Sequence, residues 1–351
     1  MRVTMLVPPY VDHPVGGMTV YYEYANRLVA RGHQVGVHHG WAPEIAQRFP
    51  KEALDGFVVP SRHWFSFDAR VEVHHSVAYD VPGLPDADVL FNGAIVGSPR
   101  GKGVPTVLVQ GLGFFSRDAE DRDFAPRGPK LCVSRALVGE LLERGIPDDE
   151  VFYVPNGVDL STFRLTRPLE DRPRRVAMLF HVLPVKGTDL GLEALERIRA
   201  AVPDVEAVLF GTDPRPPTLA PWIEYRHLPS RSALVEDVYN GSSVLMCPSR
   251  KEGFYLCGLE AMATGCAFAS TRAGGMLDYS EHEVSALLSP VGDVDALSAN
   301  VVRLLRDEPL RRRLATAGLS RAREFSWEST VDRLEAALLT SCNAARRRAS
   351  A

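Results

Sequence analysis

The chain has no hydrophobic stretch long enough to cross a membrane and no long run of basic residues. Of its 351 residues, 45% are hydrophobic and 24% are charged, and the net charge is -4. A membrane-spanning helix takes about 20 consecutive apolar residues, and a nucleic-acid-binding surface is strongly basic. We therefore expect neither a transmembrane segment nor a nucleic-acid partner.

Metal-binding and disulfide patterns are absent as well. The five cysteines include no C-x-x-C pair, and the histidines show no H-x-E or H-E-x-x-H spacing. Residues 38–39 and 74–75 are His-His pairs, but neighbours on a strand point to opposite faces, so neither pair is suited to share one ion. The apolar segment Met1–Pro8 is typical of a buried first strand and not of a signal peptide. These features predict a cytoplasmic protein without a structural metal.

The most informative segment runs from Ser249 to Gly265. An apolar run over 243–247 is short enough for a buried strand, and the residues from Leu256 onward have helical apolar spacing. Glu252 therefore lies in a loop and Glu260 in the following helix. The N-terminus of a helix attracts phosphate, whereas carboxylates accept hydrogen bonds from hydroxyls. A phosphate group between two hydroxyl-rich groups describes a nucleotide sugar.

This stretch resembles the E-x7-E motif of retaining glycosyltransferases with the GT-B fold, in the large family often numbered four. The resemblance implies that Glu260 binds the ribose and Glu252 the donor sugar. It also implies that the loop and helix start face the diphosphate, over Gly253, Phe254, Tyr255 and Leu256.

Alternating strand-like and helical segments predict an α/β protein with parallel sheets. Residues 154–159, V-P-N-G-V-D, resemble the hinge of the same enzymes. We expect two Rossmann-like, doubly wound domains facing a deep cleft: an acceptor domain over 1–153 and a nucleotide-sugar domain over 154–327. The family's last helix, here 328–345, crosses back to the first domain. The charged stretch 167–175 is expected to be an exposed linker.

Further donor contacts follow from the resemblance. Lys186 lies in a Pro-x-Lys-Gly segment whose lysine holds the donor phosphates in the family. Glycines directly before the first helix meet the diphosphate from the first domain, and a glycine and two residues at strand ends lie near the nucleobase. In this chain these positions are Gly16, Gly17, Gly211, His227 and Leu228.

The chain departs from the family pattern at two positions. His181 stands where an arginine is usual, and it can donate to phosphate only if protonated or in the right tautomer. Gln110 stands where many relatives have a histidine, and an amide is no general base. Arg250 and Arg272 are the candidates to replace the missing cation. In one view of the family's mechanism the leaving phosphate itself takes the acceptor proton, so no protein base is needed.

The expected activity is a retaining, metal-independent transfer of a hexose-type sugar from a nucleotide diphosphate, with a UDP-sugar as donor and no cofactor. Glu252, Lys186, Gln110 and Arg250 are the candidate catalytic residues. The acceptor, a sugar, a glycolipid or a small molecule, is expected near aromatic residues and a mobile loop over 116–130. The aromatic candidates are Trp64, Phe65, Phe114, Phe115 and Phe124. A sugar-nucleotide epimerase, a sugar phosphorylase and a catalytically silent nucleotide-sugar-binding subunit are the alternatives.

Overall fold

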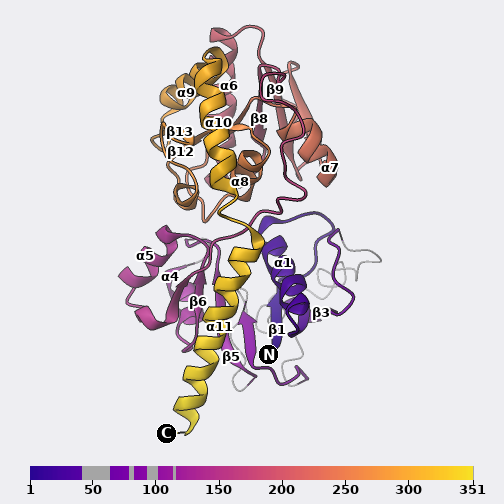
Figure 1. The fold of residues 1–351 in the computed structure, drawn as a ribbon, viewed down its shortest axis with the longest axis vertical. Helices are drawn as coiled ribbons and strands as arrows, with labels where there is room; N and C mark the ends of the chain where they lie inside the picture. The colour runs from indigo at the N-terminus through magenta and orange to yellow at the C-terminus, as the bar shows by residue number, and fades with distance from the viewer. Residues whose placement is uncertain (42–63, 79–82, 93–101, 114–115, 351) are drawn as a thin grey trace. The chain divides into compact units, whose positions relative to one another are not determined.

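The computed structural model describes residues 1–350 except 42–63, 79–82, 93–101 and 114–115 (Figure 1). The chain forms two compact units. One is Met1–Pro155 together with Thr330–Ala351, and the other is Asn156–Ser329. From the sequence, the boundaries between the two domains are expected after residues 153 and 327.

The first unit is built on a sheet of seven parallel strands in the order β3-β2-β1-β4-β5-β6-β7. The chain starts at β1, inside the sheet, builds outward to the β3 edge and then returns to build from β4 to the β7 edge, which is the doubly wound arrangement. The central strands are buried along most of their length, as expected for a parallel sheet. The strands are β1 (Arg2–Val7), β2 (Gln34–Trp41), β3 (Glu72–Ala78), β4 (Val89–Asn92), β5 (Val104–Val109), β6 (Lys130–Cys132) and β7 (Val151–Tyr153).

The last helix of the chain packs on this first unit. Helix α11 (Trp327–Ser350) belongs to it from Thr330 onward. Arg31, just after α1 (Gly16–Ala30), donates to Asp332 at 2.6 Å and to Glu335 at 2.9 Å. The Thr330 hydroxyl donates to the carbonyl of Pro155 at 2.8 Å. The helix therefore crosses back to the first unit, as the resemblance predicts.

The segment expected as a mobile loop, 116–130, is largely ordered into regular elements. It contains α4 (Arg117–Phe124) and the start of β6, and α5 (Arg135–Glu143) follows. The Ser116 hydroxyl accepts from the amide of Ala119, which caps α4. The prediction of a loop was therefore wrong, because several of the charged residues that suggested it form the exposed face of a helix, namely Arg117, Asp118, Asp121 and Arg122.

The aromatic residues expected at the acceptor site mainly complete the first unit. Phe124 is 4% exposed. Trp64 and Phe65 pack against the ring of Tyr22, with ring centroids 5.3 and 5.1 Å away. Phe114 and Phe115 lie outside the described residues. Trp64, Phe65 and Phe124 thus serve packing, which is the more common use of such side chains.

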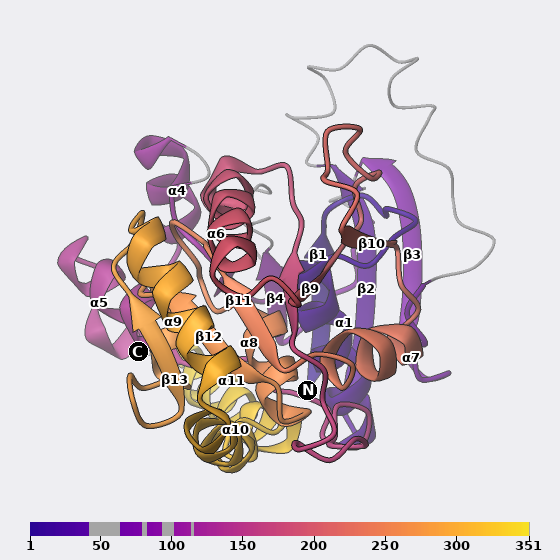
Figure 2. The same ribbon diagram turned by 90° about the horizontal axis from the view of Figure 1, so that it is seen from above.

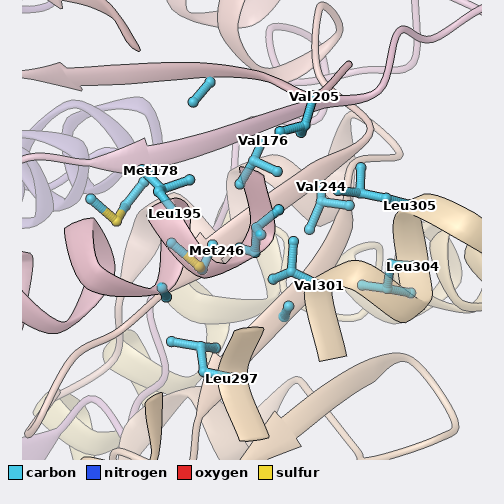
Figure 3. Packing of buried hydrophobic residues seen from close by; sticks show 14 of the residues in the cluster. Val176, Met178, Leu195, Val205, Val244, Met246, Leu297, Val301, Leu304 and Leu305 are labelled. Carbon is cyan, nitrogen blue, oxygen red and sulfur yellow. The ribbon is translucent and has the colours of Figure 1, made fainter. Parts of the chain in front are cut away.

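The second unit repeats the same winding in a sheet of six parallel strands, ordered β10-β9-β8-β11-β12-β13. Its apolar core lies between the sheet and the helices α6 (Thr188–Ala201) and α9 (Val294–Arg306), and Figure 3 shows Val176, Met246 and Val301 among its members. Figure 2 shows α6 and α9 beside one another over these strands. The strands are β8 (Arg175–Leu179), β9 (Glu206–Gly211), β10 (Ile223–His227), β11 (Val244–Cys247), β12 (Ala267–Thr271) and β13 (Ala286–Ser289).

Two parts of the second unit differ from the sequence analysis. The expected helix over 232–239 is a short α7 (Arg231–Ala233) that continues as the π-helical segment η3 (Leu234–Tyr239). The expected linker 167–175 is not exposed throughout. Arg172 is 6% exposed, and its guanidinium donates to the carbonyls of Tyr239 and Ser242, both at 3.1 Å. A buried guanidinium is tolerated here because backbone oxygens satisfy it.

Candidate functional site

The E-x7-E segment has the predicted local structure of strand, loop and helix. β11 ends at Cys247, Glu252 lies in the loop, and α8 (Leu256–Ala263) carries Glu260. Tyr255 precedes the helix in the left-handed conformation, with φ of 68°, and its carbonyl accepts from the Tyr279 hydroxyl at 2.8 Å. A bulky residue takes this conformation only where its surroundings enforce it. The turn into α8 is therefore held in a fixed, strained shape.

A glycine pair lies directly beneath this loop. The amide of Glu252 donates to the carbonyl of Ala273 at 2.7 Å, and the amide of Gly275 donates back to the carbonyl of Glu252 at 3.0 Å. A Cβ on Gly275 would lie 1.8 Å from the carbonyl oxygen of Gly253. The Gly274–Gly275 turn thus permits backbone contact that no other residue allows. The η4 turn (Gly275–Asp278) then leads to Tyr279.

Lys186 and Glu252 meet although 66 residues separate them. The Lys186 ammonium lies 2.9 Å from each carboxylate oxygen of Glu252. The Ser249 hydroxyl donates to the first of these oxygens at 2.7 Å. The side chain of Glu252 is 5% exposed and that of Lys186 is 23% exposed. Because an ammonium has three N–H bonds, two directed to Glu252 leave a third for a ligand.

The start of α8 is suited to an anion. No side chain caps it, and its first turn contains no acidic residue. The first N–H groups of a helix lack partners within the helix and carry a partial positive charge. Phe254 and Tyr255 are 3% and 6% exposed, so their side chains pack inward while the backbone forms the turn. That the backbone of this turn faces a diphosphate stays a prediction from the resemblance.

Glu260 accepts a hydrogen bond from the buried hydroxyl of Tyr239 at 2.9 Å. Burial raises the pKa of Glu260 above its ordinary value, whereas the Tyr239 hydrogen bond and the charge of Arg231 oppose that rise. Because a carboxylate has two oxygens with two acceptor sites each, Glu260 retains capacity for further hydroxyl donors.

His181 is fixed in one tautomer. Its Nδ1 accepts from the amide of Leu183 at 3.0 Å, so the proton of the neutral ring must lie on Nε2. Burial and the nearby charge of Lys186 lower the pKa of His181. Near neutral pH the ring therefore offers an uncharged N–H donor at Nε2. The tautomer that the sequence left open is the one that suits an acceptor such as phosphate.

Arg250 braces the loop that carries Lys186. Its guanidinium makes two contacts with Asp189, at 2.9 and 2.7 Å, and donates to the carbonyl of Pro184 at 2.7 Å. The amide of Arg250 also donates to the carbonyl of Val185 at 2.7 Å. Since Asp189 neutralises the guanidinium, Arg250, one of the candidates to replace the missing cation, is already paired, and the arrangement gives it a structural part.

The residues expected near the nucleobase lie at the ends of two adjacent strands. Gly211 ends β9 and His227 ends β10, and the two are paired in register. The amide of Leu228 donates to the carbonyl of Gly211 at 2.8 Å, and Leu228 has a φ of 46° with 43% of its surface exposed. A Cβ on Gly211 would approach the carbonyl oxygen of Phe180 to 2.4 Å. Packing therefore explains Gly211, while Leu228 is strained and exposed at a strand end.

In the first unit, Gly16 and Gly17 form the first turn of α1 and not the loop before it. No side chain caps this helix start. The Gln110 amide donates to the carbonyl of Gly17 at 3.1 Å. Gln110 directly follows β5, so it holds the helix start at the carboxyl end of the sheet, where ligands of doubly wound folds bind. The structure thus joins two candidates that the sequence treated separately.

Within the described ranges, no three or more His, Cys, Asp or Glu side chains gather as a metal site would require. The adjacent histidines pair across strands instead: His38 stacks on His74 and His39 on His75, with ring centroids 4.5 and 4.8 Å apart. Each helix of the described chain is too short or too polar to span a bilayer.

Part of the second unit is similar to a known protein family. Residues 175–307 match the model of "Glycosyl transferases group 1". The MMP alpha-(1->4)-mannosyltransferase of Mycolicibacterium hassiacum is 33% identical over 215 residues, which are 57% of this chain and 51% of the relative. A D-inositol 3-phosphate glycosyltransferase of Thermobifida fusca is 28% identical and covers 92% of this chain and 88% of its own. The chain spans about half the length of the first curated relatives it matches.

Solved structures share the fold over nearly the whole chain. A sucrose-phosphate synthase of Thermosynechococcus elongatus has a TM-score of 0.75 at 16% identity, covering 95% of this chain and 97% of its own. The Anabaena protein HepE, in complex with UDP-glucose, has a TM-score of 0.73 at 16% identity, covering 97% and 100%. The fold is GT-B, and residues 175–307 are similar to the glycosyl transferases group 1 family.

Proposed function

We propose that this protein is a retaining, metal-independent glycosyltransferase that moves a hexose-type sugar from a nucleotide diphosphate to a hydroxyl acceptor. The observation that carries the proposal is the arrangement around α8. Its uncapped start lies between Glu252, which contacts Lys186, and Glu260 further along the helix. Anion-binding backbone flanked by two acceptor carboxylates suits a nucleotide sugar.

The proposal assigns a role to each of these groups. The start of α8 and the third N–H of Lys186 bind the diphosphate, Glu252 orients the hexose, and Glu260 accepts from the ribose hydroxyls. The neutral Nε2–H of His181 donates to a phosphate oxygen. Negative charge develops on the departing diphosphate, and fixed donors aimed at that charge lower the barrier. Glu252 also supports the stabilisation of this charge, because it holds the Lys186 ammonium in place.

Transfer with retention is proposed to occur on one face of the sugar. The bond from the anomeric carbon to the diphosphate breaks, a bond to the acceptor oxygen forms on the same face, and the acceptor proton passes to a phosphate oxygen. Gln110 takes no proton in this scheme. Its hydrogen bond to Gly17 supports a positioning role at the start of α1. No resident cofactor is needed, and a UDP-sugar is the proposed donor because the structural relative HepE is solved with UDP-glucose.

The test is a transfer assay with UDP-, GDP-, dTDP- and ADP-sugars, a panel of sugar, glycolipid and small-molecule acceptors, and excess EDTA. We expect acceptor-dependent release of one nucleoside diphosphate, and proton NMR of the product showing the donor's anomeric configuration. Glu260→Gln should lose activity, whereas Glu193→Gln, a surface carboxylate paired with Arg197, should not. Inversion or a requirement for metal would contradict the mechanism. Conversion of one sugar nucleotide into another without acceptor would indicate an epimerase.

A further inference from the structure

A π-helical segment ends at the tyrosine that contacts Glu260, one of the two glutamates of the E-x7-E motif. The segment η3, Leu234–Tyr239, is a π-helix, and the amide of Asn240 donates to the carbonyl of Val235 at 2.9 Å, five residues back. π-helical turns are uncommon and are frequently found at functional sites. Here the wider turn ends at Tyr239, whose hydroxyl donates to Oε2 of Glu260 at 2.9 Å.

The Tyr239 ring is fixed on several sides. It is fully buried, at 0% exposure, and packs against Phe163 and Phe210 with ring centroids 6.2 and 5.7 Å away. Its carbonyl accepts from the buried guanidinium of Arg172 at 3.1 Å. With both ring and backbone held, the hydroxyl has one available position. It therefore presents a preformed donor to Glu260.

The neighbouring carboxylate is flexible by nature and needs such a partner. A glutamate side chain has several rotatable bonds, and ordering it costs conformational entropy. The hydrogen bond from Tyr239 uses one carboxylate oxygen and fixes the plane of the group. The Glu260 carboxylate is then already ordered when a ligand binds, so binding does not have to supply the free energy of ordering it. A supporting residue increases affinity in this way.

We propose that Tyr239 is a positioning residue that fixes the Glu260 carboxylate to accept the ribose hydroxyls of the nucleotide donor, and thereby sets the preference for ribose-containing nucleotides. This inference rests on the proposed function, because it requires that Glu260 binds ribose. Tyr239 touches Glu260 and not the donor. Its contribution should therefore appear only with ligands whose hydroxyls reach Glu260.

The experiment compares the affinity for UDP with that for 2′,3′-dideoxyuridine diphosphate by calorimetry. The variant is Tyr239→Phe, which removes the hydroxyl and keeps the packing against Phe163 and Phe210. Tyr21→Phe, at a buried tyrosine of the first unit, is the matched control. We expect Tyr239→Phe to weaken UDP binding by roughly tenfold, the loss of about one hydrogen bond to a charged group. Its affinity for the dideoxy analogue, and both affinities of Tyr21→Phe, should stay at the wild-type values.

Two results would overturn the inference. If Tyr239→Phe weakens the binding of UDP and of the dideoxy analogue equally, the residue only packs. The same conclusion follows if the variant keeps both the wild-type preference for UDP and the wild-type thermal midpoint. Glu260→Gln separates this inference from the function on which it rests. If Glu260→Gln loses the preference for UDP and Tyr239→Phe keeps it, only the role of Tyr239 fails. If Glu260→Gln itself keeps the preference, the ribose site fails and the inference with it.

Discussion

The Lys186 ammonium contacts both carboxylate oxygens of Glu252 at 2.9 Å, so the two groups act as one unit. Glu252 is nearly buried, and Ser249 satisfies one of its oxygens. A buried ion pair of this kind adds little net stability, but removing one partner leaves an uncompensated charge. The pair therefore fixes a cation beside the start of α8 and makes that cation hard to replace.

Lys186→Ala should lower the rate of sugar transfer by about a hundredfold to a thousandfold, the usual effect of losing one group that stabilises transition-state charge. It should also destabilise the second unit by about 3 kcal/mol, because Glu252 loses its counter-charge. Lys251→Ala, at an exposed lysine next to Glu252 in the chain, is the control. Steady-state kinetics and chemical denaturation measure the two effects. A wild-type rate in Lys186→Ala would remove this lysine from the mechanism.

Gly275→Ala should distort the loop that carries Glu252. A methyl group there would lie 1.8 Å from the Gly253 carbonyl oxygen, so the backbone must move. We expect a loss of about 2 kcal/mol or more in unfolding free energy, in the range for overpacking of a tight site, together with weaker nucleotide binding. Gly139→Ala is the matched control, because nothing lies within 4 Å of its added methyl and alanine favours the helix α5. Equal stability of the two variants would contradict the close packing.

Gly17→Ala separates ligand approach from folding. The atoms nearest to its Cβ would be those of the Gln110 amide group, at 3.4 Å or more, which is ordinary contact. The variant should therefore fold with a wild-type thermal midpoint. If the diphosphate approaches this helix start as predicted, the rate of transfer should fall at least tenfold, since about 1.4 kcal/mol corresponds to tenfold. An unchanged rate with the same midpoint would place the donor away from Gly17.

His38 should make the first unit less stable in acid. Burial, and the nearby charge of His74, lower the pKa of His38 from 6.5 to about 4. Between these values the unfolded chain binds the proton more readily, so stability rises with pH. The resulting loss of stability is absent above about pH 6.5 and grows as the pH falls toward 4. It amounts to at most about 3 kcal/mol, at 1.36 kcal/mol for each pKa unit.

Chemical denaturation at pH 7.5, 5.5 and 4.5 measures this contribution as the difference between wild type and His38→Gln. His74→Gln, which removes the stacked neighbour and its charge, should show a smaller loss on acidification than wild type. Identical pH profiles for wild type and His38→Gln would show that this histidine titrates normally.

Local patterns in the sequence were enough to predict the central part of the site. A short apolar run, a glycine after Glu252 and helical spacing from Leu256 define strand, loop and helix within about twenty residues, and the structure has them in that order. Strand β11 and helix α8 depend on neighbours close in the chain. The same local information missed α9 and α10 (Glu308–Ala322), although Asp293 and Asp307 cap their starts and are recognisable helix signals.

Contacts between distant residues were not predictable. Nothing in the sequence pairs Arg250 with Asp189, which lies 61 positions earlier, or Tyr239 with Glu260. Likewise, the tautomer of His181 follows from the amide of Leu183, which reaches the ring only in the folded loop. The register of pairing between β2 and β3 could not be predicted from the sequence either. The stacking of His38 on His74 and of His39 on His75 was therefore not expected.

The central claim, that the E-x7-E segment holds a nucleotide sugar, is tested most directly by calorimetric titration with UDP, GDP, dTDP and ADP. The account predicts selective binding of one nucleotide, UDP, that Glu260→Ala weakens by roughly thirtyfold through the loss of charged hydrogen bonds worth about 2 kcal/mol. Glu193→Gln should bind as wild type does. The account would be contradicted if none of the four nucleotides bound, or if one bound with the same affinity after Glu260→Ala.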